Sequence, residues 1–280
     1  MAFATRTVSV LAARLAFALG AAAARAGEPT PSEVPPPPAS PPIEAPKEAE
    51  PAAPAKEWSV SLDSTFNSAY VWRGLRLNDE AVWQPSVSAS WRGLTATLWG
   101  NVDLTDRNQE KRHVSEVDYS LEYGWTCEKL RFVVGAVRYE YPNTSFDGTT
   151  EVYASVGVDT LLSPTLKVWR DVDLVKGAYG ALMVSHTFAD VARLSKAASL
   201  SLDCQGSVGY GSHRHNLAYY GIGRAAAADA TFGLGLPIQV GDHWRIRPSL
   251  NFTHILDGAA ARSVGYRDTF WVGLSTTFSF

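Results

Sequence analysis

The stretch that decides the fold runs Phe270-Trp271-Val272-Gly273-Leu274-Ser275-Thr276-Thr277-Phe278-Ser279-Phe280. Every second residue from Phe270 to Phe280 has a large apolar side chain, except Thr276. The residues between them, which form the other parity of the stretch, are small or polar, except Trp271. Successive side chains of a β-strand point to opposite faces, so the stretch predicts a strand with one apolar and one polar face. Such a strand suits a transmembrane barrel, and the edge strand of a soluble sandwich is the alternative.

The same alternation recurs throughout residues 57–280. Twelve segments of about ten residues show it: 58–66, 85–91, 94–104, 116–123, 130–136, 151–159, 166–172, 178–188, 199–208, 229–238, 244–253 and 270–280. Charged residues such as Asp118, Asp203 and Arg245 fall on the enclosed face, where a dry sandwich core would penalise them and a water-filled lumen would not. The sequence therefore predicts an all-β fold, an antiparallel transmembrane β-barrel of about twelve strands.

The connections between these segments alternate in length. Short ones are expected at Arg92-Gly93, 126–129, 162–164 and 241–243, and long ones at 74–82, 105–113, 140–149, 211–224 and 256–267. Short turns at one end and long loops at the other are typical of barrels in bacterial outer membranes. Two connections depart from this rule, since 173–177 is short and 189–196 is long.

The first 56 residues are of a different kind. Residues 1–26 predict a secretory signal peptide, with Arg6 and Arg14 before or within an apolar stretch and Ala24-Arg25-Ala26 as the cleavage site. Residues 27–56 predict a Pro-rich disordered linker, because residues 28–56 contain eleven of the sixteen prolines. Such an arm is either a tether that reaches peptidoglycan or a spacer without a partner.

Composition excludes several functions. Without residues 1–26 the chain has 22 Lys and Arg against 28 Asp and Glu, so nucleic acid is not an expected partner. Cys127 and Cys204 have no metal-ligand spacing, and no cofactor is implied. His213-Arg214-His215 is interpreted as a solvated loop tip rather than as half of a metal site.

Three short motifs carry a family likeness. Asn67-Ser68-Ala69-Tyr70-Val71-Trp72-Arg73-Gly74, Tyr139-Glu140-Tyr141-Pro142 and Glu151-Val152-Tyr153 resemble stretches of the TorF-like family of Gram-negative porins. The likeness covers residues 57–280 and implies an outer-membrane barrel in contact with lipid; the Pro-rich arm departs from the family pattern. By resemblance to outer-membrane barrels, Phe278 and Phe280 are the signal that the barrel-assembly machinery reads.

Parity places a set of charged side chains on the lumen face. Arg73 is expected there, with Tyr70 and Trp72 facing lipid, and it either forms a constriction or pairs with a carboxylate. Glu122 is expected to pair with Arg131 across a hairpin. The predicted lining has ten acids (Asp63, Asp103, Glu116, Asp118, Glu122, Glu151, Asp159, Asp171, Asp203 and Asp229) and five bases (Arg73, Arg131, Lys167, Arg245 and Arg247).

These residues predict a channel for passive diffusion of small polar solutes in the outer membrane of a Gram-negative bacterium. Acidic linings favour cations, so a weak cation preference is expected. Inward Trp99, Tyr153, Trp169 and Trp271 would partly fill the bore. A structural or wall-tethered barrel without transport is the alternative. An outer-membrane hydrolase is the third class; His254 lacks a recognisable Ser partner, so no enzyme activity is expected.

Overall fold

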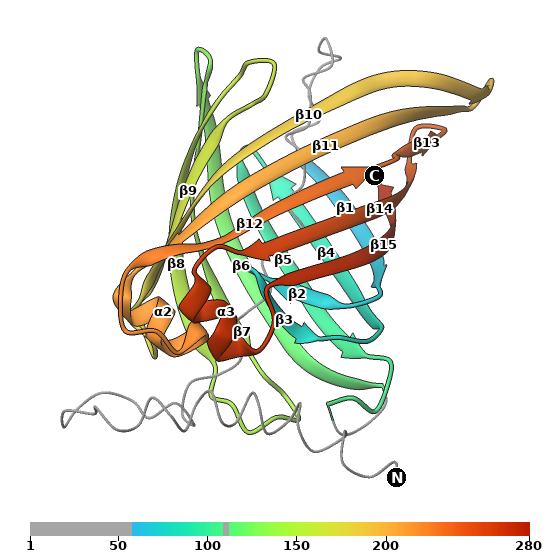
Figure 1. The fold of residues 1–280 in the computed structure, drawn as a ribbon. Coiled ribbons are helices and arrows are strands. Elements are labelled where there is room, and N and C mark those ends of the chain that lie inside the picture. The colour runs from blue at the N-terminus through green and yellow to red at the C-terminus, as the bar shows by residue number, and fades with distance from the viewer. Residues whose placement is uncertain (1–57, 109–111) are drawn as a thin grey trace.

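In a computed structural model, residues 58–108 and 112–280 can be described. They form a closed antiparallel barrel of twelve strands (Figure 1), because the first wall strand pairs with the last. The wall strands are β1 (Trp58–Asn67), β4 (Val82–Trp91), β5 (Leu94–Asp103), β6 (His113–Cys127), β7 (Leu130–Glu140), β8 (Thr149–Val158), β9 (Thr165–Asp171), β10 (Ala178–Ser195), β11 (Ala198–Gly211), β12 (Ala226–Gly235), β14 (Trp244–Ile255) and β15 (Asp268–Ser279).

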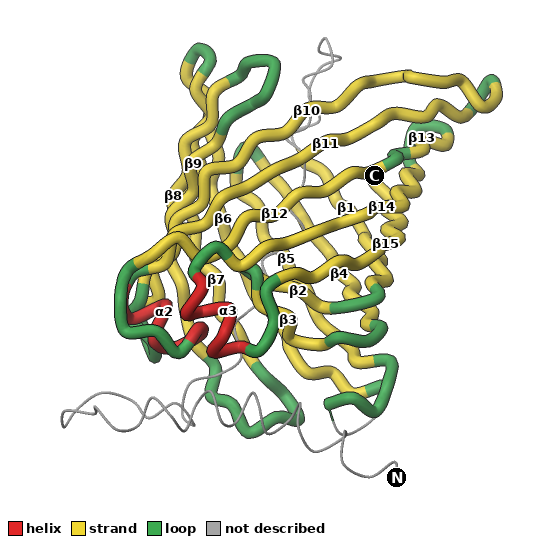
Figure 2. Tube along the Cα trace, viewed as in Figure 1, coloured by secondary structure: helices red, strands yellow, loops and turns green. Residues whose placement is uncertain are grey.

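Five further elements of the described residues lie outside this count. The short strands β2 (Tyr70–Trp72) and β3 (Leu75–Asn78) pair only with each other. The strand β13 (Ile238–Val240) continues β12 beyond Pro237 and pairs with both neighbours of β12, namely β11 and β14. Proline has no N–H to donate to the ladder, which explains the break between β12 and β13. The helices α2 (His213–Tyr220) and α3 (Gly258–Val264) lie together at the long-loop end (Figure 2).

The apolar parity faces outward on all sides of the barrel. Side chains such as Leu62, Leu98, Leu121, Leu182 and Leu250 are about half exposed, although they are large and apolar. Trp58, Trp91, Trp125 and Trp244 form an exposed aromatic girdle near the short-turn end. A closed barrel with an apolar belt and aromatic girdles is the form in which β-sheets span the outer membrane of Gram-negative bacteria. This chain is therefore an outer-membrane β-barrel.

Each predicted strand is present, but some bounds differ. The predicted loop 189–196 is mostly strand, because β10 and β11 continue as a paired ribbon to a tight turn after Ser195. A bulge opposite Leu200–Leu202 interrupts the apolar–polar alternation there. The alternation in the sequence therefore did not predict this part of the strand. Figure 1 shows this ribbon extending beyond the rest of the barrel. The described residues contain no helix long and apolar enough to cross a membrane.

The signal peptide predicted for residues 1–26 and the linker predicted for residues 27–56 lie outside the described residues. The register at the closing seam is continuous, from Ser61 opposite Ser279 to Asn67 opposite Gly273. Phe278 packs against Trp244 and Phe280, with ring centroids 4.7 and 4.8 Å apart. The role of Phe278 and Phe280 as an assembly signal stays a prediction.

Candidate functional site in the barrel lumen

A hairpin folds into the lumen at the long-loop end. We call residues 70–78, which form β2 and β3, the plug hairpin. Its two-residue turn is Arg73-Gly74, with φ of 43° and 83°, and two central residues at positive φ suit the twist of a tight hairpin. Tyr70 and Trp72 are 5% and 2% exposed, so the expectation that they face lipid is wrong. The wall strand ends at Asn67, and the parity of β1 does not extend into a separate hairpin.

Arg73 is the centre of this plug. Its guanidinium donates two hydrogen bonds, of 2.8 and 3.0 Å, to the carboxylate of Glu151 on β8. It also lies 4.2 Å from the ring centroid of Trp72 and 4.5 Å from that of Tyr179. The Tyr139 hydroxyl donates to the same Glu151 at 3.1 Å. The paired, aromatic-stacked guanidinium therefore fixes the hairpin to the wall, as one of the two sequence interpretations predicted.

Gly74 permits a close approach that another residue would prevent. A Cβ placed on it would lie 2.6 Å from Cβ of Asp229 and 2.9 Å from the Tyr220 hydroxyl. That hydroxyl donates a hydrogen bond to the backbone carbonyl of Arg73. Tyr179, which stacks on Arg73, donates to Asp229 at 2.8 Å. The turn of the plug hairpin is thus in contact with β12 and α2 as well as with β8.

The helix α2 covers the plug from the loop side. Ser212 caps its N-terminus, and Gly221 at φ 67° ends it. Its His215 is 2% exposed and lies against Trp72, Tyr179 and Tyr219, so the expectation of a solvated loop tip at 213–215 is wrong for His215. His213 and Arg214 do remain exposed. Burial, aided by the charge of Arg73, lowers the pKa of His215 to about 3, so its imidazole is neutral at pH 7.

A pair of carboxyl groups forms the other side of the plug. Glu116 and Asp118 on β6 are 3% and 5% exposed and, two residues apart on one strand, share its inward face. The Tyr70 hydroxyl of the plug hairpin donates to Glu116 at 2.8 Å. Burial, reinforced by Glu116, raises the pKa of the Tyr70 phenol, which therefore keeps its proton as a donor. Glu116 is thus bonded to the plug hairpin, and both carboxyl groups are buried and do not line an open passage.

The predicted lining divides into two layers. The plug layer is buried at the long-loop end. It contains Arg73 and six carboxyl groups, those of Asp103, Glu116, Asp118, Glu151, Asp171 and Asp229. The vestibule is the periplasmic part of the lumen, with four acids and four bases, namely Asp63, Glu122, Asp159, Asp203, Arg131, Lys167, Arg245 and Arg247. Apart from Asp203, these vestibule residues are at least partly exposed. The whole excess of five negative formal charges therefore belongs to the plug layer.

Charges in the vestibule are paired differently from the prediction. Arg131 does not meet Glu122, because the register sets Arg131 opposite Thr126 and Glu122 opposite Gly135. Glu122 instead accepts a hydrogen bond of 2.9 Å from Tyr153. Asp203 accepts from Arg247 at 3.0 Å and from Arg245 at 3.3 Å. Two guanidiniums share that one carboxylate, which is why Asp203 can be buried.

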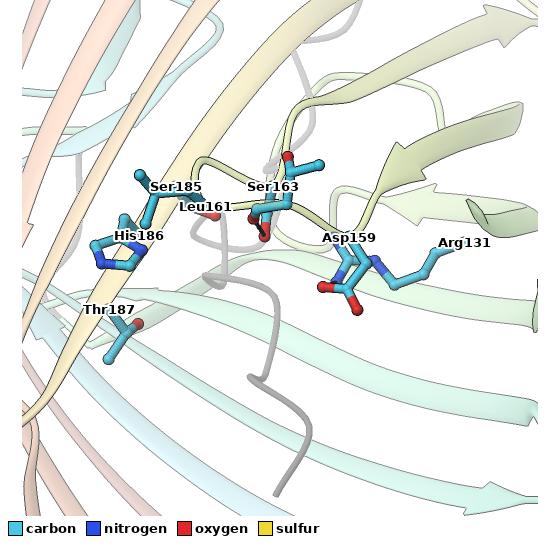
Figure 3. A pocket seen from close by; sticks show the side chains of 8 residues that line it. Arg131, Asp159, Leu161, Ser163, Ser185, His186 and Thr187 are labelled. Atoms are coloured by element: carbon cyan, nitrogen blue, oxygen red, sulfur yellow. Dashed lines mark hydrogen bonds and ion pairs between the residues drawn. The ribbon is translucent and has the colours of Figure 1, made fainter. Parts of the chain in front are cut away.

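Arg131 borders a small polar cavity at the periplasmic end. It lies 4.0 Å from Asp159. Figure 3 shows this pair on one side and Ser185, His186 and Thr187 of β10 on the other. The cavity has a volume of about 200 Å³. It is lined by residues near the turn between β8 and β9 and is separate from the plug.

Among residues 58–108 and 112–280, no three His, Cys, Asp or Glu side chains are grouped to hold a metal ion. Cys127 and Cys204 are free thiols. On the outer face, Nδ1 of His254 lies 2.7 Å from Asp268. The outward neighbours of His254 along the chain, Phe252 and Leu256, are apolar and offer no nucleophile.

Sequence reasoning missed the residues that close the lumen from outside the wall strands. They are Tyr70, Trp72, His215, Tyr219 and Tyr220, each less than a tenth exposed. The signal available was the aromatic content of 70–72 and 219–220 within segments predicted as strand end and loop. Large aromatic side chains in a loop can indicate that the loop packs against something.

Comparisons with known proteins match the barrel fold at low identity. No family model and no curated protein matches this chain. An outer-membrane channel from Pseudomonas putida F1 is 11% identical, with 83% of this chain and 100% of that chain covered and a TM-score of 0.47. The porin NanC is 10% identical (78% and 98% covered, TM-score 0.45), and LpxR from Salmonella typhimurium is 9% identical (78% and 99%, 0.45). What the lumen does must therefore be inferred from this chain's own side chains.

Proposed function

We propose that this protein is a porin-like channel for passive diffusion of small polar solutes, closed at the loop end by the plug hairpin. The observation that carries the proposal is the contrast along the lumen. Its periplasmic part is lined by partly exposed polar side chains, whereas its outer part is filled by a hairpin that is separate from the wall. A barrel that served only as a wall anchor would not need a vestibule lined by partly exposed charged side chains.

The plug hairpin can be displaced without opening the barrel. Its strands form a two-stranded sheet of their own and share no ladder with the wall strands. Side-chain bonds hold it in place: Arg73 to Glu151 and Tyr70 to Glu116 from the hairpin, and Tyr220 to the Arg73 carbonyl from α2. Closed and open states can therefore differ in a few side-chain contacts, while every hydrogen bond of the wall is kept.

Charge placement supports a weak cation preference in the open state only. The vestibule is balanced, and the five excess negative formal charges lie where the hairpin now sits. Removing the hairpin takes away Arg73 and exposes the carboxyl groups of β6, β8 and β12 to the passage. An acidic ring raises the local concentration of cations, and the effect is greatest at low salt.

The test is a planar-bilayer recording of refolded protein across a salt gradient. We expect small or intermittent conductance for the wild type. A variant with residues 70–78 replaced by a Gly-Ser linker should give larger, steady, cation-preferring conductance. Adding Glu116→Gln and Asp118→Asn to that variant should shift the reversal potential toward zero. Asp63→Asn with Glu122→Gln, which remove the same charge from the vestibule, should shift it less. Anion selectivity in the hairpin-replaced protein would contradict the proposal.

A structural barrel is the second candidate, and the filled outer lumen is the observation in its favour. It predicts no conductance even after the hairpin is replaced, in protein whose heat-modifiable gel migration shows an intact barrel. The tether to peptidoglycan that this candidate invokes would involve residues 28–56, which lie outside the described residues. We propose no hydrolase activity, and release of fatty acids from phospholipid by the wild type, lost in His254→Ala, would contradict this.

The likeness to the TorF-like family is part of the same proposal. All three motifs that carry it meet in the plug layer, where Arg73 and Tyr139 bond to Glu151 and Tyr70 bonds to Glu116. Tyr141 is buried there too. Because the three motifs meet in the plug layer, the likeness supports a plug in common with that family better than it supports a solute in common.

A further inference from the structure

Three arginines converge at the start of α3, at the long-loop end of the barrel. Asp257 caps α3 and accepts hydrogen bonds from the backbone N–H groups of Ala259 and Ala260. Its other carboxylate oxygen is bonded by Arg224, which precedes β12. The side chains of Arg262 and Arg267 reach the same place from the end of α3 and from just beyond it.

Gly258 shows how closely they approach. A Cβ built on this glycine would lie 3.0 Å from Nη2 of Arg267 and 3.6 Å from Nη1 of Arg262. Two guanidiniums thus lie within 4 Å of one point, beside the residue whose carboxylate binds a third. Because Gly258 has no side chain, the two guanidinium groups can approach the backbone at the start of α3.

The charges at this point do not balance. Among the described residues, Asp257 is the one carboxylate bonded there, and its bond is to Arg224. Asp268, the residue after Arg267, is engaged by His254 at 2.7 Å, and Asp79 is engaged by Arg107 at 2.6 Å. In the part of the chain that the structure describes, no carboxylate hydrogen-bonds or ion-pairs with Arg262 or Arg267. Like charges held this close are destabilising without an anion between them.

The cluster is accessible from outside the cell. Arg224, Arg262 and Arg267 are all exposed, and loops at this end of a barrel face the exterior. The guanidinium of Arg76 in the plug hairpin lies 4.4 Å from the ring centroid of Tyr266, the residue before Arg267. Guanidinium groups present paired N–H donors in a fork that matches the oxygens of a phosphate group.

We propose that Arg224, Arg262 and Arg267 form a binding site for a phosphate group at the outer mouth of the barrel. Its source is either the phosphorylated head group of a lipid in the outer leaflet or a soluble phosphate ester. The inference does not depend on conduction and would stand if the barrel were purely structural.

Inorganic pyrophosphate is the soluble probe, titrated calorimetrically into refolded protein in zwitterionic detergent at low salt. Lipid A in mixed micelles, with its dephosphorylated form as the comparison, is the lipid probe. The test variant is Arg262→Gln with Arg267→Gln. The matched control is Arg193→Gln with Lys196→Gln, which removes the same charge from the exposed ribbon turn at the opposite end of the barrel. Heat-modifiable migration confirms that each variant is folded.

We expect wild type and control to bind at least one phosphorylated probe, and the test variant to bind it about tenfold more weakly, as loss of charge-assisted bonds requires. Binding of pyrophosphate alone identifies a soluble ligand, and binding of lipid A but not its dephosphorylated form identifies a lipid. The proposal is overturned if the wild type binds neither probe, if test and control variants weaken equally, or if dephosphorylated lipid A binds as well as lipid A.

Discussion

Arg73 is the residue on which closure of the lumen depends. It has a positive φ of 43°, a doubly hydrogen-bonded carboxylate partner and three aromatic rings within 5.0 Å of its guanidinium carbon. Both partners of the pair have side chains only 3% exposed. A buried pair of this kind contributes little net stability, but removing one partner leaves the other charge buried and unpaired.

Arg73→Ala should therefore release the plug hairpin and leave the barrel folded. The unpaired Glu151 should destabilise the closed state by about 3–5 kcal/mol, enough to convert a closed lumen into a mostly open one. Bilayer conductance measures this directly. The matched control is Arg92→Ala, since Arg92 occupies the same Trp-Arg-Gly-Leu sequence at an exposed periplasmic turn. Equal conductance in the two variants would contradict the role given to Arg73.

Gly74→Ala tests the close approach of the turn. The substitution adds a Cβ 2.6 Å from Asp229 at a φ of 83°, so steric overlap is added to backbone strain. Gly265→Ala provides the strain alone, because its φ is 84° and no atom lies within 4 Å of the added Cβ. We expect both to be destabilising by about 1 kcal/mol or more, with the larger loss for Gly74. Only Gly74→Ala should raise conductance. A larger loss of stability in Gly265→Ala than in Gly74→Ala would show that the turn of the plug hairpin can accommodate a Cβ.

At the scale of elements, α2 acts as a cover whose stability depends on a neutral histidine. His215 has a pKa of about 3 in the closed state, and an exposed histidine has one near 6.5. Between these values the released state takes up a proton that the closed state does not bind. The contribution of His215 to the stability of the closed state is therefore complete above about pH 6.5, and it is lost as the pH falls toward 3.

His215→Phe should make closure less sensitive to pH. The wild type should lose up to about 1.4 kcal/mol of closure per pH unit through this group between pH 6 and pH 4. Phenylalanine keeps the ring contacts with Trp72 and Tyr219 and cannot titrate. The conductance of wild type, His215→Phe and the exposed control His213→Phe is compared across this range. Carboxyl groups of the plug layer also titrate, so the difference between variants is the relevant quantity, and identical profiles would contradict the prediction.

At the scale of the whole molecule, closure of the sheet depends on β15. This strand pairs with β14 on one side and with β1 on the other, and Phe280 itself bonds to the carbonyl of Val60 at 2.9 Å. Its aromatic residues near the short-turn end, Phe278 and Phe280, lie beside Trp244 in the girdle. The last strand is thus both the seam of the barrel and part of its membrane anchor.

Deletion of Phe280 should reduce the amount of heat-modifiable protein recovered in the outer-membrane fraction, with synthesis unchanged. The reason is loss of an aromatic anchor and of one hydrogen bond at the seam between β15 and β1. Phe270→Ala removes another exposed aromatic side chain from the other end of the same strand and is the control. Assembly of the deletion variant at the level of wild type would remove the role assigned to Phe280.

Strand positions and the inner and outer faces could be predicted from the sequence, because the pattern that encodes them is local. Alternation has a period of two residues, so a window of about ten residues suffices to assign a strand and its faces. The apolar belt, the short turn at Arg92-Gly93 and the inward direction of Glu116, Asp118 and Asp203 all follow from such windows. Predictions from this alternation failed where a bulge or the end of a strand shifted it, as in the ribbon after Phe188 and the hairpin after Asn67.

Closure of the lumen was decided only by the tertiary structure. Trp-Arg-Gly-Leu occurs twice and forms a two-residue hairpin turn at both places, yet Trp72 is 2% exposed and Trp91 is 55% exposed. The difference comes from partners remote in the chain, since Glu151 lies 78 residues and Tyr220 lies 147 residues from Arg73. A local pattern specifies the turn, but whether it is buried depends on which distant wall residues the closed barrel brings around it.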